Sequence, residues 1–296
     1  MQQKPKPNVH IARLDNSVVF KKLFRDPDVL SEFIKDLLGL DLQLTADQIE
    51  TEKKFTPPVG NVDIAYDIFV DDPENRIVIE IQRVRYGNHY DRFFYYFLIA
   101  IIELVKSHKT YKMDRTVYTI VWLTRQTQDK TYQKSILTNT FVTEANTGQK
   151  INVYPHKLIF LNPHYIDDKT PKGIADWMNL VIQSLKHPTN PELNYERDIF
   201  RKATELIAED GLNPTERAEI LDENAYVDNI EEAREDGELR RQRKLMIKLL
   251  NRQFSNENEA QLKAIITRIE ETDDLATLEE WYDQILDAEF LRELTF

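Results

Sequence analysis

The chain has 296 residues, of which 41% are hydrophobic, so it is long enough for about two domains with apolar cores. Fifty-one acidic and 39 basic side chains give a formal net charge of -12, which argues against a protein that coats nucleic acid with a uniformly basic surface. The absence of cysteine excludes disulfides, thiolate zinc sites and cysteine nucleophiles, and it fits a reducing cytoplasm.

Neither a membrane span nor a nucleotide-binding loop is expected from the sequence. The longest apolar stretch, 93–105, is too short to cross a bilayer and predicts a buried helix. The polar opening, 1–7, is typical of a loose arm and not of a secretory signal. Only seven glycines occur, and none forms a phosphate-binding loop. We therefore expect a cytoplasmic protein without membrane contact.

The first half of the chain has the pattern of a mixed α/β fold. Apolar residues at helical spacing predict helices over 15–24 and 28–38, with Asp15 or Asn16 capping the first and Gly39 ending the second. Two strands, 62–70 and 76–82, predict a hairpin around 71–75. The pattern then predicts a helix over 90–106 and strands over 116–124 and 151–161.

From residue 171 onward the pattern predicts helices alone, over 174–185, 196–209, 215–225 and 230–254 and through the apolar positions of 262–286. We therefore expect two domains, an α/β domain over 1–170 and a helical region over 171–296. A flexible joint is expected near 187–194 or 211–214. An acidic block, 231–238, precedes a basic run, 240–248, which fits either a solvated helix or one that binds DNA or a partner.

The hairpin carries the residues that point to chemistry. Glu80 and Gln82 lie two apart on one strand and should share a polar face, with Ile79 and Ile81 on the dry face behind them. A turn centred between Pro73 and Glu74 places Asp67 opposite Glu80. Directly opposed strand residues have Cβ atoms about 5 Å apart, where two like charges repel unless a cation or a proton lies between them.

A divalent metal ion resolves this conflict. Magnesium binds few protein carboxylates, keeps several waters and neutralises charge on a phosphate. Gln82 can orient an attacking water but brings no positive charge. Asp63 lies on the same face but about 13 Å along the strand from Asp67, which makes it the weaker candidate.

These residues resemble those of the PD-(D/E)XK nuclease superfamily, and within it the Rpn-type recombination-promoting nucleases, often labelled transposases. The resemblance rests on Asp67, on Glu80-Ile81-Gln82 with glutamine in place of lysine, and on Arg92 followed by Tyr95 and Tyr96. Asp15, Phe20, Lys21 and Phe24 resemble the first-helix signature of the family. The resemblance is specific over 60–96 and loose after residue 170.

The resemblance implies a restriction-endonuclease-like core, in which a mixed central sheet is flanked by helices, with an all-helical C-terminal extension. It implies metal-dependent, largely sequence-independent DNA cleavage in a bacterial cytoplasm, in recombination or mobile-element biology. We expect Asp67, Glu80 and the backbone carbonyl of Ile81 to bind magnesium, with manganese able to substitute. Gln82 would orient the nucleophilic water.

Several residues keep two interpretations. Arg92 is either a partner of the carboxylates or a phosphate clamp, since its planar fork suits both. Tyr96 and Lys21 are candidates for substrate contact, although Tyr95 and Tyr96 also fit a core. Asp15 is a helix cap or an extra carboxylate near the metal. His89 is a phosphate contact or a surface residue.

A competing hypothesis is not enzymatic. The same fold could serve as a DNA-binding or protein-interaction module without catalysis. In either case we expect DNA as a partner and self-association through the helical C-terminal region.

Overall fold

The computed structural model describes residues 7–55, 64–83, 89–105, 113–127, 129–139, 142–255 and 257–295. The chain divides into two compact units, Met1–Asp222 and Glu223–Phe296. No helix among these described residues is both long and apolar enough to cross a membrane.

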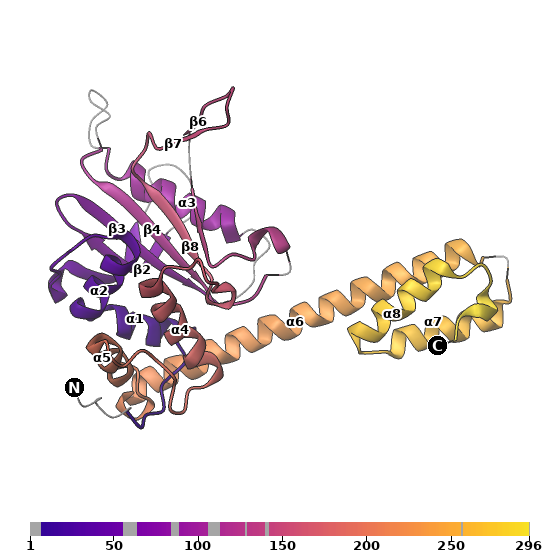
Figure 1. Cartoon of the computed structure of the whole chain (residues 1–296). Helices are drawn as coiled ribbons and strands as arrows, with labels where there is room; N and C mark the ends of the chain where they lie inside the picture. The colour runs from indigo at the N-terminus through magenta and orange to yellow at the C-terminus, as the bar shows by residue number, and fades with distance from the viewer. Residues whose placement is uncertain are drawn as a thin grey trace. The chain divides into compact units, whose positions relative to one another are not determined.

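A six-stranded mixed sheet forms the centre of the first unit (Figure 1), in the order β1-β2-β3-β4-β8-β5. Its strands are β1 (Ile49–Phe55), β2 (Ile64–Asp71), β3 (Asn75–Gln82), β4 (Thr116–Leu123), β8 (Lys157–Leu161) and β5 (Ile136–Thr138). Strands β3, β4 and β8 are parallel, and the outer strands β1, β2 and β5 pair antiparallel. A separate two-stranded ribbon consists of β6 (Val142–Thr143) and β7 (Lys150–Ile151).

Helices cover both faces of the sheet (Figure 1). One face packs against α1 (Ser17–Phe24), α2 (Pro27–Leu38), α4 (Lys172–Lys186) and α5 (Asp198–Leu206), and the other packs against α3 (His89–Ile102). Trp122 of β4 and Trp177 of α4 are both fully buried in the first core. The opposite core joins Phe93 and Phe97 of α3 to Val78 and Val121 of the sheet. Short 3-10 helices connect these elements at Ala46–Gln48, Lys130–Tyr132, Pro163–Tyr165 and Glu209–Gly211.

Local sequence explains where α2 begins and ends. The Asp26 carboxylate accepts hydrogen bonds from the backbone N–H groups of Asp28 and Val29, and Pro27 occupies the first helical position. Gly39 ends the helix with a left-handed φ of 71°.

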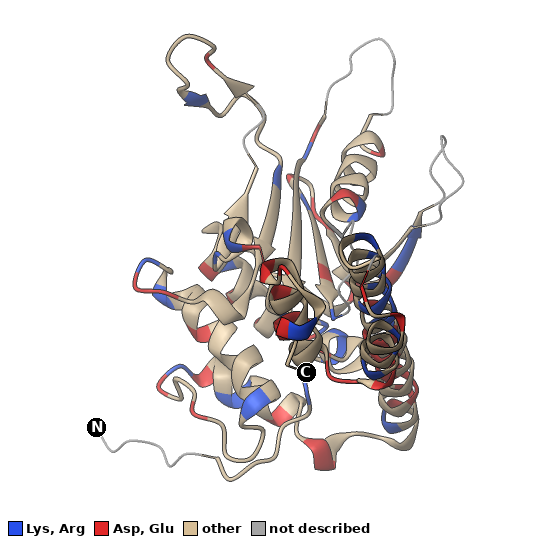
Figure 2. Cartoon of the chain, turned by 90° about the vertical axis from the view of Figure 1, so that its right-hand side faces the viewer, with Lys and Arg blue, Asp and Glu red and all other residues tan. Residues whose placement is uncertain are grey.

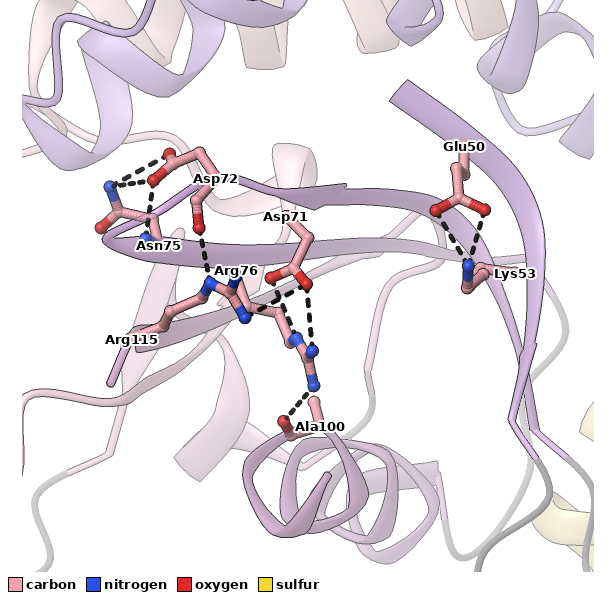
Figure 3. A network of polar contacts seen from close by, with 8 residues as sticks. All are labelled: Glu50, Lys53, Asp71, Asp72, Asn75, Arg76, Ala100 and Arg115. Atoms are coloured by element: carbon pink, nitrogen blue, oxygen red, sulfur yellow. Dashed lines mark hydrogen bonds and ion pairs between the residues drawn. The ribbon is translucent and has the colours of Figure 1, made fainter. Parts of the chain in front are cut away.

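A polar network fixes the β2–β3 hairpin at its turn (Figure 3). One carboxylate oxygen of Asp72 accepts from the backbone N–H groups of Glu74 and Asn75, at 2.7 and 2.8 Å. The nearly buried Arg76 forms an ion pair with Asp71 and donates to the carbonyl oxygen of Ala100 at the end of α3, at 3.0 Å. The network therefore sets the register of the hairpin and connects it to α3.

The second unit has its own apolar core. It contains most of the long helix α6 (Pro214–Gln253), together with α7 (Glu259–Glu271), α8 (Leu275–Asp287) and a final 3-10 turn, Leu291–Glu293. Met246, Leu250, Ile269 and Ile285 are completely buried where these helices meet.

The fold class expected from the sequence is confirmed, with differences in detail. The expected strand over 151–161 is shorter, because only Lys157–Leu161 pairs in the main sheet. The helices expected over 215–225 and 230–254 form one continuous helix. The 93–105 stretch is not buried all round, because Phe94, Leu98 and Ile102 of α3 are exposed.

The first compact unit extends to Asp222, so the boundary expected at residue 170 lies within it. Helices α4 and α5 lie beyond residue 170, but they complete the first core, with Ile174, Trp177 and Phe200 almost fully buried. The strand β1 was not predicted at all, since its sequence is dominated by charged residues.

We predict that Arg76→Met lowers the free energy of unfolding by about 2 to 3 kcal/mol, because a charged side chain with several hydrogen bonds is lost from a nearly buried position. Urea denaturation followed by circular dichroism measures the change. Glu50→Gln is the matched control, since it breaks the exposed Glu50–Lys53 ion pair in Figure 3 and should cost less than about 1 kcal/mol. Equal losses in both variants would contradict the role of the network.

Candidate active site at the β2–β3 hairpin

Two carboxylates meet where the β2–β3 ladder ends. The ladder pairs Ile68 with Ile79, and the same register places Asp67 opposite Glu80, as the sequence predicts. Beyond this point, side-chain carboxylates accept the hydrogen bonds of backbone N–H groups on the opposite strand. The backbone N–H of Asp67 donates to Glu80 Oε1 at 3.2 Å, and the backbone N–H of Ile81 donates to Asp67 Oδ2 at 3.0 Å. The two side chains therefore lie between the strands.

The strands β1 and β2 reverse their faces beside this pair. Ile68 and Val70 of β2 belong to the core under α1 and α2, but Ile64 and Tyr66 belong to the core under α3. Residues an even number apart share a face of a regular strand, so β2 is irregular between Tyr66 and Ile68. The distortion lies next to Asp67, which the β1–β2 pairing skips, and side-chain periodicity alone does not reveal it.

The polar residues that β3 contributes to the site are buried, whereas Asp67 of β2 is half-buried. Glu80 is 2% exposed and Gln82 is 7% exposed. Ile79 and Ile81 pack into the core on the opposite face, as predicted. The face that carries Glu80 and Gln82 lies under α3 and its core, so these polar side chains are enclosed.

Burial raises the pKa of Glu80 well above its usual value, and the adjacent Asp67 carboxylate raises it further. The hydrogen bond from the Asp67 backbone and the positive charges of Arg92 and Lys21 oppose this shift. Burial and the neighbouring carboxylate thus both favour the protonated form of Glu80 over the charged form.

Two cationic side chains from different helices pair with the neighbours of the carboxylates. Arg92 of α3 donates to Gln82 Oε1 at 3.3 Å and to the hydroxyl oxygen of Tyr96 at 3.1 Å. Lys21 of α1 forms an ion pair with Glu52 of β1 at 2.7 Å. Arg92 thus connects the predicted substrate-contacting Tyr96 to Gln82, which brings these three candidates together.

Tyr66 and Tyr96 support the site from the α3 side. The Tyr66 hydroxyl donates to the Tyr96 backbone carbonyl at 2.9 Å, and both rings are buried. Burial, followed by the nearby Glu80, raises the pKa of Tyr66, so its phenol stays protonated as a donor. The Tyr95 hydroxyl is also buried, and no hydrogen-bond partner for it occurs among the described residues.

Asp15 does not cap the first helix. The N-cap of α1 is Asn16, and the Asp15 carboxylate instead pairs with Arg13 at 2.8 Å and with Arg83 at 3.3 Å. Arg83, which follows Gln82 directly, also donates to the side-chain oxygen of Asn16 at 3.1 Å. Of the two expected caps, Asn16 therefore occupies the N-cap position and Asp15 does not, although no side-chain hydrogen bond caps the helix.

Two candidates cannot be placed. Asp63 lies outside the described residues, and so does the side chain of His89. Sequence reasoning also missed Glu52, Tyr66 and Arg83, whose contacts come from segments far apart in the chain. Of these three residues, only Tyr66 could have been found from the sequence, because the periodicity of its strand could have indicated that it is buried.

The residues present fit a hard divalent cation. A buried carboxylate, Glu80, lies beside a half-buried one, Asp67, so a cation between them would offset both their repulsion and the burial of charge. Oxygen donors are the ligands that magnesium prefers. Within the described ranges, no group of three or more histidine and acidic side chains could hold a metal. Such an ion would therefore keep several waters.

Comparison with protein-family models places the chain. Residues 14–236 match the model described as PD-(D/E)XK nuclease family transposase. The chain belongs to this family. The match covers the hairpin, the sheet and the helices of the first unit, so this nuclease-family assignment applies to the part of the chain that carries Asp67 and Glu80. The same comparisons gave no match to a curated protein or to a solved structure.

We predict that the metal-free protein loses stability as the pH rises from the usual glutamate range through the raised pKa of Glu80. In that interval the folded state binds the Glu80 proton more tightly than the unfolded state, so deprotonation favours unfolding. Thermal unfolding in chelator across this pH range measures the effect. Glu80→Gln, which mimics the protonated form, should flatten the pH dependence, and an unchanged slope in that variant would contradict the assignment.

Proposed function

We propose that this PD-(D/E)XK family member is a metal-dependent DNA endonuclease that hydrolyses phosphodiester bonds, with a role in recombination or in mobile elements. The observation that carries the proposal is the Asp67–Glu80 pair, in which two opposed strands hold a buried glutamate beside a half-buried aspartate. A structural role alone does not account for two adjacent carboxylates at such a position, because repulsion and burial both destabilise them.

The carboxylates of Asp67 and Glu80, with the backbone carbonyl of Ile81, would hold magnesium or manganese. When bound, the ion supplies a Lewis acid that activates water and neutralises charge on the phosphate. The chain provides the positioning. The Asp67 side chain is fixed by the N–H of Ile81, and Glu80 is fixed by the N–H of Asp67.

Gln82 and Arg92 would act on the attacking water and on the substrate. The backbone carbonyl of Gln82 accepts from the N–H and the hydroxyl of Thr124, which anchors the end of β3. Its side-chain oxygen accepts from Arg92. The amide can thus orient the nucleophilic water, while the guanidinium group contacts a phosphate oxygen of the DNA.

The distribution of charge favours local contacts with DNA. The net charge is -12, and acidic and basic positions are interspersed along the helices in Figure 2. Binding would therefore depend on a few phosphate contacts near the site and on the metal. We also propose that the protein acts in the cytoplasm and self-associates through its helical C-terminal region.

We predict metal-dependent nicking or cutting of supercoiled plasmid by the purified protein, in magnesium or manganese and not in chelator. Glu80→Ala and Asp67→Asn should each lower the rate by at least about 100-fold, because each removes a ligand and a charge from the site. Gel electrophoresis over time measures the rates. Glu50→Gln, an exposed carboxylate on β1, is the control and should cleave at the wild-type rate.

No cleavage by folded wild-type protein across plasmid, linear duplex and single-stranded DNA would contradict the endonuclease proposal. That outcome would instead support the non-enzymatic module.

A second prediction separates the two roles of Arg92. If the guanidinium contacts a phosphate, Arg92→Met should reduce the slope of log affinity against log salt by about 1 in calcium, which we expect to support binding without cleavage. Fluorescence anisotropy with labelled duplex DNA measures the slope. An unchanged slope with a lower cleavage rate would show that Arg92 acts only through Gln82 and Tyr96.

A further inference from the structure

The backbone of β1 is strained at Glu52. Among the described residues only Glu52 and Asn190 combine a side chain with a left-handed φ, at 56° and 54°. Asparagine tolerates this region well, but glutamate in the middle of a strand does not. Strain of this kind persists only where surrounding contacts impose it, and it concentrates at functional sites.

Glu52 occupies the point where β1 passes the carboxylate pair. The β1–β2 ladder pairs Thr51 with Ile68 and Lys53 with Tyr66, so the same register places Glu52 opposite Asp67. Strand β1 reverses its faces here, as β2 does, because Ile49 lies in one core and Phe55 packs against the other. The printed pairing is interrupted at this position and resumes on both sides of it, so the Glu52 backbone lies next to that of Asp67.

The Glu52 side chain holds a cation at this position. Its carboxylate lies 2.7 Å from the ammonium group of Lys21, and this hydrogen bond and charge lower the pKa of Glu52. The Lys21 side chain is 18% exposed, although the Glu52 side chain is 65% exposed. An ordinary surface ion pair contributes little to stability and would not explain a strained backbone.

The site needs the cation that Lys21 can supply. Gln82 is neutral, and Arg92 is already hydrogen-bonded to Gln82 and Tyr96. Charge that develops on a phosphate during hydrolysis is stabilised by fixed cations nearby. The ammonium group of Lys21 is paired with Glu52, whose position in the β1–β2 register is opposite Asp67.

We propose that Glu52 is a positioning residue, whose left-handed backbone and carboxylate fix the Lys21 ammonium group beside the Asp67–Glu80 pair, where it stabilises the phosphate during cleavage. This inference rests on the proposed endonuclease function. It assigns Glu52 a role that acts entirely through Lys21.

The test uses Glu52→Gly in the full-length protein. Glycine adopts a positive φ without strain, so the variant should unfold at a higher temperature than wild type. Its cleavage rate at saturating DNA should nevertheless fall by about 10- to 100-fold, because the lysine is no longer held. Asn190→Gly, at the other left-handed position, is the matched control and should retain the wild-type rate. A stabilised Glu52→Gly variant with unchanged cleavage would overturn the proposal.

Lys21→Met provides a second readout, by calorimetric titration with manganese alone. Removing a cation from beside two carboxylates should tighten manganese binding while cleavage falls, whereas loss of structure would weaken both. The double variant that combines Lys21→Met with Glu52→Gly should lose no more of the cleavage rate than the worse single variant, since both changes act through the Lys21 ammonium group. Lys35→Met, from an exposed ion pair with Asp41, is the control.

The two proposals fail in distinguishable ways. Wild-type protein that cleaves no DNA would contradict the endonuclease function. Even then, manganese affinity that is unchanged in Lys21→Met would overturn the placement of Lys21 beside the carboxylates.

Discussion

The site depends on the repulsion between two carboxylates that the fold does not allow to separate. Asp67 and Glu80 lie on opposed strands, and each is bound to the backbone of the other strand. The Arg76 network at the turn and the cores on both faces prevent the hairpin from sliding to relieve the contact. Such an arrangement destabilises the protein unless a proton or a cation is present. The metal binding and the catalysis that we propose would both follow from this one constraint.

Each surrounding element contributes to this constraint. Helix α3 excludes water from Glu80 and presents Arg92, while α1 presents Lys21. The face reversals of β1 and β2 lie beside Asp67, and the register of the two strands is the same before and after them. The sheet therefore stays continuous on both sides of this distortion. The repulsion between the carboxylates lowers stability at the position where chemistry is expected, which agrees with the general trade-off between stability and activity.

The hairpin could be predicted because its signals are local. Turn residues flank Pro73, and β-branched residues fill β3, so the register that opposes Asp67 and Glu80 follows from counting. The signals for β1 are weak. It is an edge strand, and most of its side chains are charged, so it has few apolar residues to mark it as a strand.

The remaining features of the site depend on contacts between distant segments. The Lys21–Glu52 pair and the Arg83–Asp15 pair join residues that only the folded chain brings together. A left-handed glutamate leaves no trace in periodicity or propensity. The same holds for the burial of the Glu80 face, which requires α3 to pack on it. Sequence thus predicted the two carboxylates, while their surroundings required the structure.

The most direct test of the central claim is a crystal structure with manganese, in which anomalous scattering locates the ion. The account predicts a peak between Asp67 and Glu80, with carboxylate oxygens at roughly 2.0 to 2.2 Å as in sites that suit magnesium. A crystal soaked with manganese that shows no peak there, while Asp67 and Glu80 remain in place, would contradict it.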